Sequence, residues 1–286
     1  MRYRMIAIDL DGTLLDESGQ VSRENLDAVA AAHAAGAMVV PCTGRAWRES
    51  KTALAGMADI GSGVFVTGAV VADMATGRPL DLAVMEPYLV AEIVDFLYDL
   101  PEAILVFRES NLAGHDYLVT GNGELSANTR WWFQTCESTV VYAHHPTADD
   151  LRHTLRIAIV ASRKRMQQVT NDLRERFSQR MFLHYFGSIG PPENGQPVYV
   201  LEMFAAGVDK WRGLKWLAFN HGIDASQIAA IGDQINDLAM LANTGCGIAM
   251  GNAIEQVKAQ SDYVTLDHDA AGVAHAIGQL LTGRWK

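Results

Sequence analysis

The sequence has little cysteine and no long apolar run. Its three cysteines, Cys42, Cys136 and Cys246, are far apart and lack zinc-site spacing, which argues against a disulfide framework or a cysteine-based metal site. No stretch reaches the roughly 18 uninterrupted apolar residues of a membrane span, and the first apolar run ends at Asp9, too early for a signal peptide. We expect a soluble, cytoplasmic protein with reduced thiols.

Positive charge is also scarce. Lysine and arginine number 23 against 33 aspartate and glutamate residues, so the formal net charge is −10. Such a surface repels nucleic acid and anionic lipid, and we expect neither as a partner. A small anionic substrate can still bind where a cation and a few basic groups reverse the local field.

A short apolar run near the N-terminus ends in two carboxylates. Met5-Ile6-Ala7-Ile8 predicts a buried parallel strand that delivers Asp9-Leu10-Asp11-Gly12. In open α/β sheets the ligand crevice lies beyond the carboxyl ends of such strands, so chemistry is expected at Asp9 and Asp11. One carboxylate can attack while the other handles protons.

A second apolar run, 38–42, ends at Thr43-Gly44-Arg45. A right-handed crossover places its end at the same sheet edge as the first strand. The Thr43 hydroxyl and the backbone amides of Gly44 and Arg45 suit a phosphate group. The following residues, 46–54, predict a helix.

The last third of the chain repeats this pattern. A predicted strand over 228–231 enters Gly232-Asp233-Gln234-Ile235-Asn236-Asp237, so Asp233 and Asp237 are expected to face Asp9 and Asp11. Four close carboxylates repel unless their pKa values rise or a cation binds. Ligands made only of oxygen favour a hard ion, and sharing with phosphate favours Mg²⁺.

Lys210 opens a predicted helix over 210–220. A solvated lysine is disfavoured at a helix N-terminus, so we interpret it as functional, neutralising an attacking carboxylate and a transferred phosphoryl group. Helix capping alone accounts for Asn252, and a contact of its side chain with the crevice stays open.

The outer thirds of the chain alternate strand and helix, whereas the pattern changes from about residue 83. We therefore expect an α/β fold, with a doubly wound, mostly parallel sheet built from 1–82 and 204–286. An α+β domain spanning 83–203 is inserted between them. A length of 286 residues agrees with two domains.

In order and spacing, these four motifs resemble those of the haloacid dehalogenase superfamily. The segments Gly247–Ala253, Ser261–Thr265 and Gly272–Ala274 are further similar to its Cof-like sugar-phosphatase branch. The resemblance covers the outer thirds, and it implies that 83–203 is a cap domain inserted between the second and third motifs. One departure is Thr67-Gly68, where many relatives carry Asn-Gly.

The resemblance implies a phosphoric monoester hydrolase. Asp9 would be the nucleophile that forms an aspartyl-phosphate, and Asp11 the general acid and base. Mg²⁺ would be held by Asp9, the Asp11 backbone carbonyl and Asp233. Lys210 would steady Asp9 and the phosphate.

The remaining motif residues would serve the phosphate and the metal. Thr43, with Gly44 and Arg45, would grip the phosphoryl group, Asn236 would lie at the phosphate, and Asp237 would support the metal ligands.

The expected substrate is a small phosphorylated metabolite, such as a sugar phosphate, and the expected state is a monomer or small homo-oligomer. Two alternatives stay open: a phosphomutase, and a non-catalytic regulator that binds a phosphometabolite. The regulator is disfavoured because both carboxylates of the first motif, Asp9 and Asp11, are present.

Overall fold

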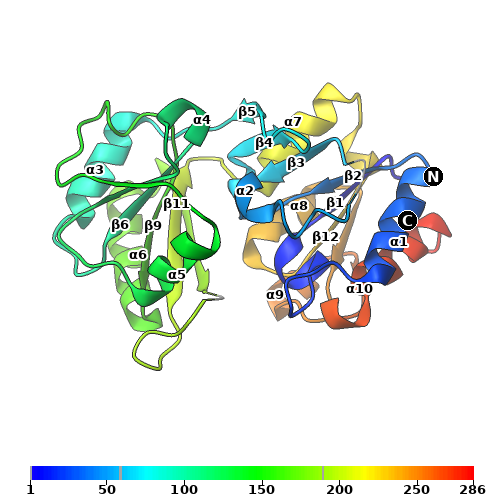
Figure 1. Ribbon diagram of the computed structural model, residues 1–286. Coiled ribbons are helices and arrows are strands. Elements are labelled where there is room, and N and C mark those ends of the chain that lie inside the picture. Colours follow the sequence, from blue (N-terminus) through cyan, green and yellow to red (C-terminus); the bar gives the residue numbers. More distant parts are fainter. Residues whose placement is uncertain (1, 58–59, 189) are drawn as a thin grey trace. The chain divides into compact units, whose positions relative to one another are not determined.

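The computed structural model describes residues 2–57, 60–188 and 190–286 (Figure 1). The chain divides into two compact units, Met1–Leu82 with Asp209–Lys286, and Ala83–Val208. Each unit has its own cluster of buried apolar side chains. In the described residues, no helix combines the length and apolar character needed to cross a membrane.

The first unit is built on a five-stranded parallel sheet in the order β14-β13-β12-β1-β2. The strands are β1 (Met5–Ile8), β2 (Met38–Pro41), β12 (Ile228–Gly232), β13 (Cys246–Ala249) and β14 (Tyr263–Val264). Every residue of β1 and β12 is buried, which explains their uninterrupted apolar sequences. Because the strands are parallel, their carboxyl ends meet at one edge.

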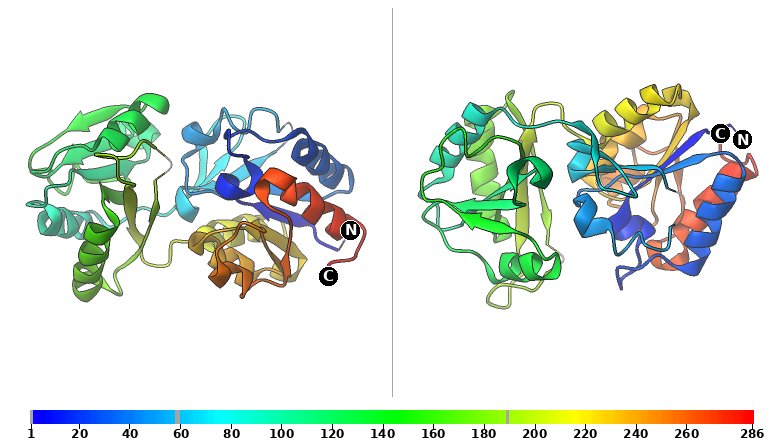
Figure 2. Two further views of the ribbon diagram at one scale, coloured as in Figure 1. Left: turned by 90° about the horizontal axis from the view of Figure 1, so that it is seen from below. Right: turned by 45° about the horizontal axis from the view of Figure 1, so that its top comes forward.

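Helices cover both faces of this sheet: α1 and α10 lie together on one side, and α7 and α8 on the other (Figure 2). The predicted doubly wound α/β fold is confirmed. The helices of this unit are α1 (Arg23–Ala34), α2 (Trp47–Ser50), α7 (Lys210–Asn220), α8 (Leu238–Asn243), α9 (Glu255–Lys258) and α10 (Gly272–Leu281).

Short helical turns follow several strand ends: η1 (Leu10–Leu14), η2 (Val66–Gly68), η4 (Ile235–Asp237) and η5 (His268–Ala270). Another turn, η3 (Ala225–Gln227), lies between α7 and β12. A small antiparallel sheet contains β3 (Ser62–Phe65), β4 (Val70–Asp73) and β5 (Pro79–Leu82). A parallel bridge between Cys42 and Val64 joins it to the main sheet.

The helix predicted over 46–54 is too long. Only Trp47–Ser50 forms α2, and the chain continues as turns to Gly56. After Ser50 one four-residue bond remains, from Leu54 N–H to the Ser50 carbonyl at 3.0 Å, and three-residue bonds follow it, as from Ala55 N–H to the Thr52 carbonyl at 3.3 Å. Regular α-helix cannot continue through that change.

The second unit is an α+β arrangement around a six-stranded sheet, in the order β10-β11-β9-β6-β7-β8. Of its neighbouring strands, β7 and β8 are parallel and the other pairs antiparallel. The strands are β6 (Ile104–Arg108), β7 (Tyr117–Thr120), β8 (Val140–Tyr142), β9 (Thr154–Ala161), β10 (Met181–Gly187) and β11 (Tyr199–Ala205).

Its helices are α3 (Pro87–Leu97), α4 (Ser110–Ala113), α5 (Ala127–Thr135) and α6 (Arg163–Phe177). Residues of α3 and α6 share an apolar core with one face of the sheet. On the other face, Phe133 of α5 packs against Tyr117 with ring centroids 4.7 Å apart.

Gly68 fixes the start of α7 against the turn η2. Its φ is +92°, and a Cβ at this position would lie 1.8 Å from the Asp209 carbonyl oxygen. The Arg212 side chain also donates a hydrogen bond to the Gly68 carbonyl at 3.2 Å. The site lysine, Lys210, directly follows Asp209, so this close approach sets its position.

We expect Gly68→Ala to lower the free energy of unfolding by at least about 3 kcal/mol, because a left-handed backbone and a steric overlap combine. The matched control is Gly19→Ala, where φ is +74° but nothing lies within 4 Å. It should cost about 1 kcal/mol. Urea unfolding measures both, and equal losses would contradict the close approach.

Candidate active site

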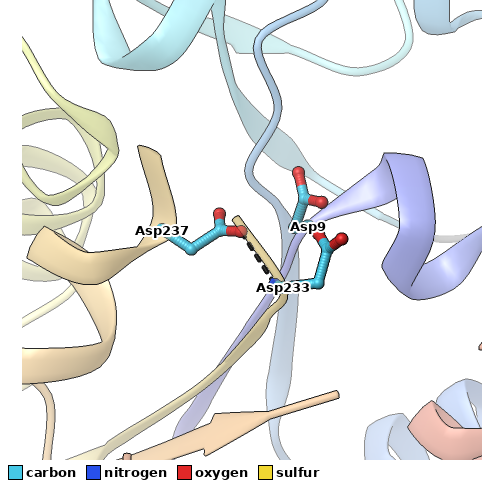
Figure 3. A group of neighbouring side chains, drawn as sticks. All are labelled: Asp9, Asp233 and Asp237. Atoms are coloured by element: carbon cyan, nitrogen blue, oxygen red, sulfur yellow. Dashed lines mark hydrogen bonds between the residues drawn. The ribbon is translucent and has the colours of Figure 1, made fainter. Parts of the chain in front are cut away.

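Three carboxylates from two neighbouring strands meet at the carboxyl edge of the parallel sheet (Figure 3). Asp9 directly follows β1, and Asp233 and Asp237 follow β12. One oxygen atom from each lies within 4.8 Å of the others. All three residues are buried. The structure therefore brings together residues more than 200 positions apart in the chain.

Lys210 holds two of these carboxylates. Its side chain is fully buried, and Nζ donates hydrogen bonds to Oδ1 of Asp9 and Oδ1 of Asp237, each at 2.5 Å. The other oxygen of Asp237 accepts the backbone N–H groups of Asp233 at 2.9 Å and Gln234 at 3.0 Å. Both oxygens of Asp237 are thus occupied by protein donors.

Burial shifts the pKa values within this group. Desolvation raises the pKa of Asp9 well above its usual range, and the nearby Lys210 ammonium only partly opposes that rise. Desolvation and the charge of Asp237 raise the pKa of Asp233 to about 6. Burial alone would lower the pKa of Lys210, but the carboxylates of Asp237 and Asp9 raise it, so the lysine stays charged.

The residues of this cluster fit a divalent cation. Three carboxylates and one ammonium carry a formal charge of −2, which a divalent ion would neutralise. Asp237 accepts hydrogen bonds from Lys210 and from two fixed backbone N–H groups. Asp9 accepts from Lys210, and within the described residues Asp233 accepts only from the side chains of Thr13 and Gln234, which can turn aside, so Asp9 and Asp233 are the side chains better placed to act as ligands. Oxygen donors of this kind suit Mg²⁺.

Gly12 makes room for Asp233. Its φ is +74°, and a Cβ would lie 2.6 Å from Oδ2 of Asp233. The Thr13 hydroxyl donates to Oδ1 of the same carboxylate at 3.3 Å, and the Gln234 amide donates to Oδ2 at 3.2 Å. The glycine turn after β1 thus orients a carboxylate that follows β12.

Asp11 lies apart from the three-carboxylate cluster, where we expected four acidic groups together. Its side chain is 44% exposed and forms an ion pair with Arg45. Nε of Arg45 donates to Oδ2 at 2.8 Å, and Nη2 donates to Oδ1. The structure therefore separates the acidic groups by environment: three are buried with Lys210, and one is paired with arginine.

The loop after β2 contains Thr43, Gly44 and Arg45. Thr43 is buried, and its hydroxyl oxygen accepts the Arg45 backbone N–H at 3.1 Å, which leaves its O–H free to donate. Because β2 is parallel to β1 and adjacent to it, this loop emerges at the same sheet edge as Asp9.

The turn η2 presents Thr67 beside this loop. Val66 and Thr67 have φ values of +50° and +54°, which β-branched residues rarely adopt. A Cβ on Gly44 would lie 3.5 Å from the Thr67 hydroxyl and 3.9 Å from the Asn236 amide nitrogen. Within the described residues, the Thr67 hydroxyl and the Asn236 side-chain oxygen are buried without a hydrogen-bond partner.

Asn252 has a role that we missed in the sequence. It does not cap a helix, since the residue before α9 is Ile254. Instead its side-chain amide donates to the Gly12 carbonyl at 2.8 Å, and its oxygen accepts the His268 N–H at 3.0 Å. Asn252 thereby holds the glycine turn next to Asp9 and Asp11. The partners are 240 and 16 residues away, so no local pattern indicates this contact.

A family model described as haloacid dehalogenase-like hydrolase matches residues 6–277. The chain belongs to this family. Phosphatase YwpJ of Bacillus subtilis is 29% identical over 298 residues, which cover 97% of this chain and 100% of that protein. The 5-amino-6-(5-phospho-D-ribitylamino)uracil phosphatase YwtE of the same organism is 29% identical over 300 residues, which cover 99% of each chain.

Among solved structures, a haloacid dehalogenase-like hydrolase from B. subtilis superposes with a TM-score of 0.75 at 26% identity, covering 97% of this chain and 99% of that one. The predictions of haloacid dehalogenase superfamily membership, of its Cof-like branch and of a phosphatase-type enzyme are confirmed.

The raised pKa of Asp233 predicts a pH-dependent stability. Its pKa is about 6 in the folded protein against 3.8 ordinarily, so between these values the folded state binds more protons than the unfolded chain. The contribution of Asp233 to the free energy of unfolding therefore falls as pH rises through about 6.

In metal-free protein at pH 8, we expect Asp233→Asn to raise the free energy of unfolding by about 1–3 kcal/mol, because it removes a buried charge. Near pH 4 the effect should be small. With Mg²⁺ the unsubstituted protein should instead have the higher free energy of unfolding, since the ion stabilises only the protein that keeps the Asp233 carboxylate. Urea unfolding at several pH values, with and without Mg²⁺, measures these free energies, and exposed Glu17→Gln is the control. An unchanged pH dependence in Asp233→Asn would contradict it.

Proposed function

We propose that this hydrolase is a Mg²⁺-dependent phosphatase that removes phosphate from small phosphate monoesters, such as sugar phosphates, through an aspartyl-phosphate on Asp9. The observation that carries the proposal is the buried Lys210 bridging Asp9 and Asp237 beside Asp233. The cluster lies at the same sheet edge as the loop of Thr43, where a phosphate can bind backbone amides. Its family and named relatives support the same chemistry.

In the first step, a carboxylate oxygen of Asp9 bonds to phosphorus as the bond from phosphorus to the ester oxygen breaks. The leaving oxygen keeps the electron pair of that bond and takes a proton from Asp11. In the second step, water attacks phosphorus and gives a proton to Asp11. The bond between phosphorus and Asp9 breaks, and inorganic phosphate and the free carboxylate result.

The other site residues position and neutralise charge. Lys210 orients Asp9 and opposes the rise of its pKa on burial, and its ammonium offsets charge on the transferred group. Thr43 and the amides of Gly44 and Arg45 bind the phosphoryl oxygens, with Asn236 beside them.

Asp9, Asp233 and the Asp11 backbone carbonyl would hold Mg²⁺, while Asp237 orients Lys210 and the loop after β12. When bound, the ion supplies positive charge against the phosphoryl oxygens.

We further propose that the second unit, 83–208, is the cap domain and sets substrate identity, because the core motifs recognise only the phosphoryl group. YwtE is named for 5-amino-6-(5-phospho-D-ribitylamino)uracil, so that ester belongs in a substrate panel with sugar phosphates. The cytoplasmic location and the monomeric or small oligomeric state stay predictions.

Asp9→Asn should lower kcat for phosphate release more than about 10³-fold, because the amide is a far weaker nucleophile than the carboxylate. Asp11→Asn should lower it by about 10²–10⁴-fold through loss of proton transfer. Phosphate release across the panel, with Glu17→Gln as control, measures both. Substantial activity in Asp9→Asn would exclude the nucleophile, and binding without turnover of any ester in the unsubstituted protein would favour the regulator.

Chelation of divalent ions should abolish phosphate release, and Mg²⁺ should restore it while Ca²⁺ does not, since Ca²⁺ takes more ligands at longer distances. Steady-state assays after dialysis against chelator measure this. Full activity in metal-free protein would contradict the proposed cofactor.

A further inference from the structure

The ion pair between Arg45 and Asp11 engages both oxygens of the Asp11 carboxylate. Nε donates to Oδ2 at 2.8 Å and Nη2 donates to Oδ1, the two-pronged geometry in which guanidinium fixes a carboxylate plane. The Arg45 side chain is 17% exposed and that of Asp11 44%. In the described part of the chain, Arg45 is the sole side-chain partner of Asp11.

Arg45 is itself held firmly by the backbone around it. Its N–H donates to the Thr43 hydroxyl at 3.1 Å, and its carbonyl accepts the Val66 N–H at 2.9 Å. Thr67 N–H donates to the Thr43 carbonyl at 3.0 Å, so the loop after β2 is bound to the turn η2 on both sides. The guanidinium therefore projects from a fixed backbone.

Asp11, in contrast, lies in an irregular turn. Its own dihedral angles are non-helical, and Gly12 follows with φ of +74°. A half-exposed carboxylate at such a turn has several rotamers open to it, and proton transfer needs one of them. An ionised carboxylate has about four acceptor sites. The Arg45 guanidinium occupies two of those of Asp11, so the other two remain able to hold the transferred proton.

We propose that the Arg45 guanidinium is a positioning residue that orients Asp11 for protonation of the leaving group, in addition to the phosphate contact of the Arg45 backbone amide. This inference rests on the proposed function. The loop after β2 would then bind the phosphoryl group through Thr43 and its backbone amides and also orient the proton donor, Asp11, through Arg45.

The test compares two substrates by kcat/KM, which covers substrate binding and the transfer to Asp9 and leaves out the later hydrolysis of the phosphoenzyme. p-Nitrophenyl phosphate has a leaving group that needs little protonation, whereas glucose 6-phosphate has an alkoxide that needs it. If Arg45 acts through Asp11, Arg45→Met should lower kcat/KM for the sugar phosphate about 10–100-fold more than for the aryl ester. Arg45→Lys should restore part of this difference, because it keeps charge but not the two-pronged geometry.

In the Asp11→Asn background, Arg45→Met should then change the sugar-phosphate rate by less than about 2-fold, since its target is already lost. Arg23→Met is the matched control: it breaks an exposed arginine–aspartate ion pair outside the second unit and should leave both substrates unchanged. Circular dichroism and thermal unfolding check that each variant folds.

Equal losses on both substrates, or full additivity with Asp11→Asn, would overturn the inference and leave Arg45 as a phosphate contact only. Failure of the proposed function is separate: it would appear as activity in Asp9→Asn on either substrate.

Discussion

A single buried ammonium allows three carboxylates to share one edge of this sheet. Lys210 satisfies one oxygen each of Asp9 and Asp237, and without it three carboxylates would share a desolvated space with no internal countercharge. Removing this ammonium would cost several kcal/mol, because the buried carboxylates would be left uncompensated. The two remaining negative charges are then the basis for binding a divalent ion. Stability and proposed chemistry thus depend on the same contact.

Backbone close approaches hold these distant groups in register. Gly68 lies against the Asp209 carbonyl, so the start of α7 and its lysine are set by the turn after β3. Gly12 lies against Asp233 and is anchored by Asn252, so the turn after β1 is set by the loops after β12 and β13. These contacts are steric or hydrogen-bonded rather than ionic, and they leave the charged side chains for chemistry.

The strand ends of the core could be predicted because each is marked in the local sequence by an apolar run followed by polar residues. An apolar run such as 5–8 followed by Asp9 indicates a buried strand and the place of its carboxylate, and parallel topology brings Asp9 and Asp233 together. The place of Lys210 does not follow from this rule, because α7 does not follow a strand of the parallel sheet and its start is fixed by Gly68. The contacts of Asn252 and of Arg45 with Asp11 could not be predicted, since they depend on loop geometry between distant segments. The positive φ of Thr67 is likewise imposed by its neighbours and not by its own preference.

We propose that these buried charges bind one divalent ion, and calorimetric titration of metal-free protein with Mg²⁺ tests this most directly. The account predicts one ion per chain, with binding lost in Asp233→Asn and preserved in Glu17→Gln. No heat of binding in the unsubstituted protein, or equal binding after Asp233→Asn, would contradict it.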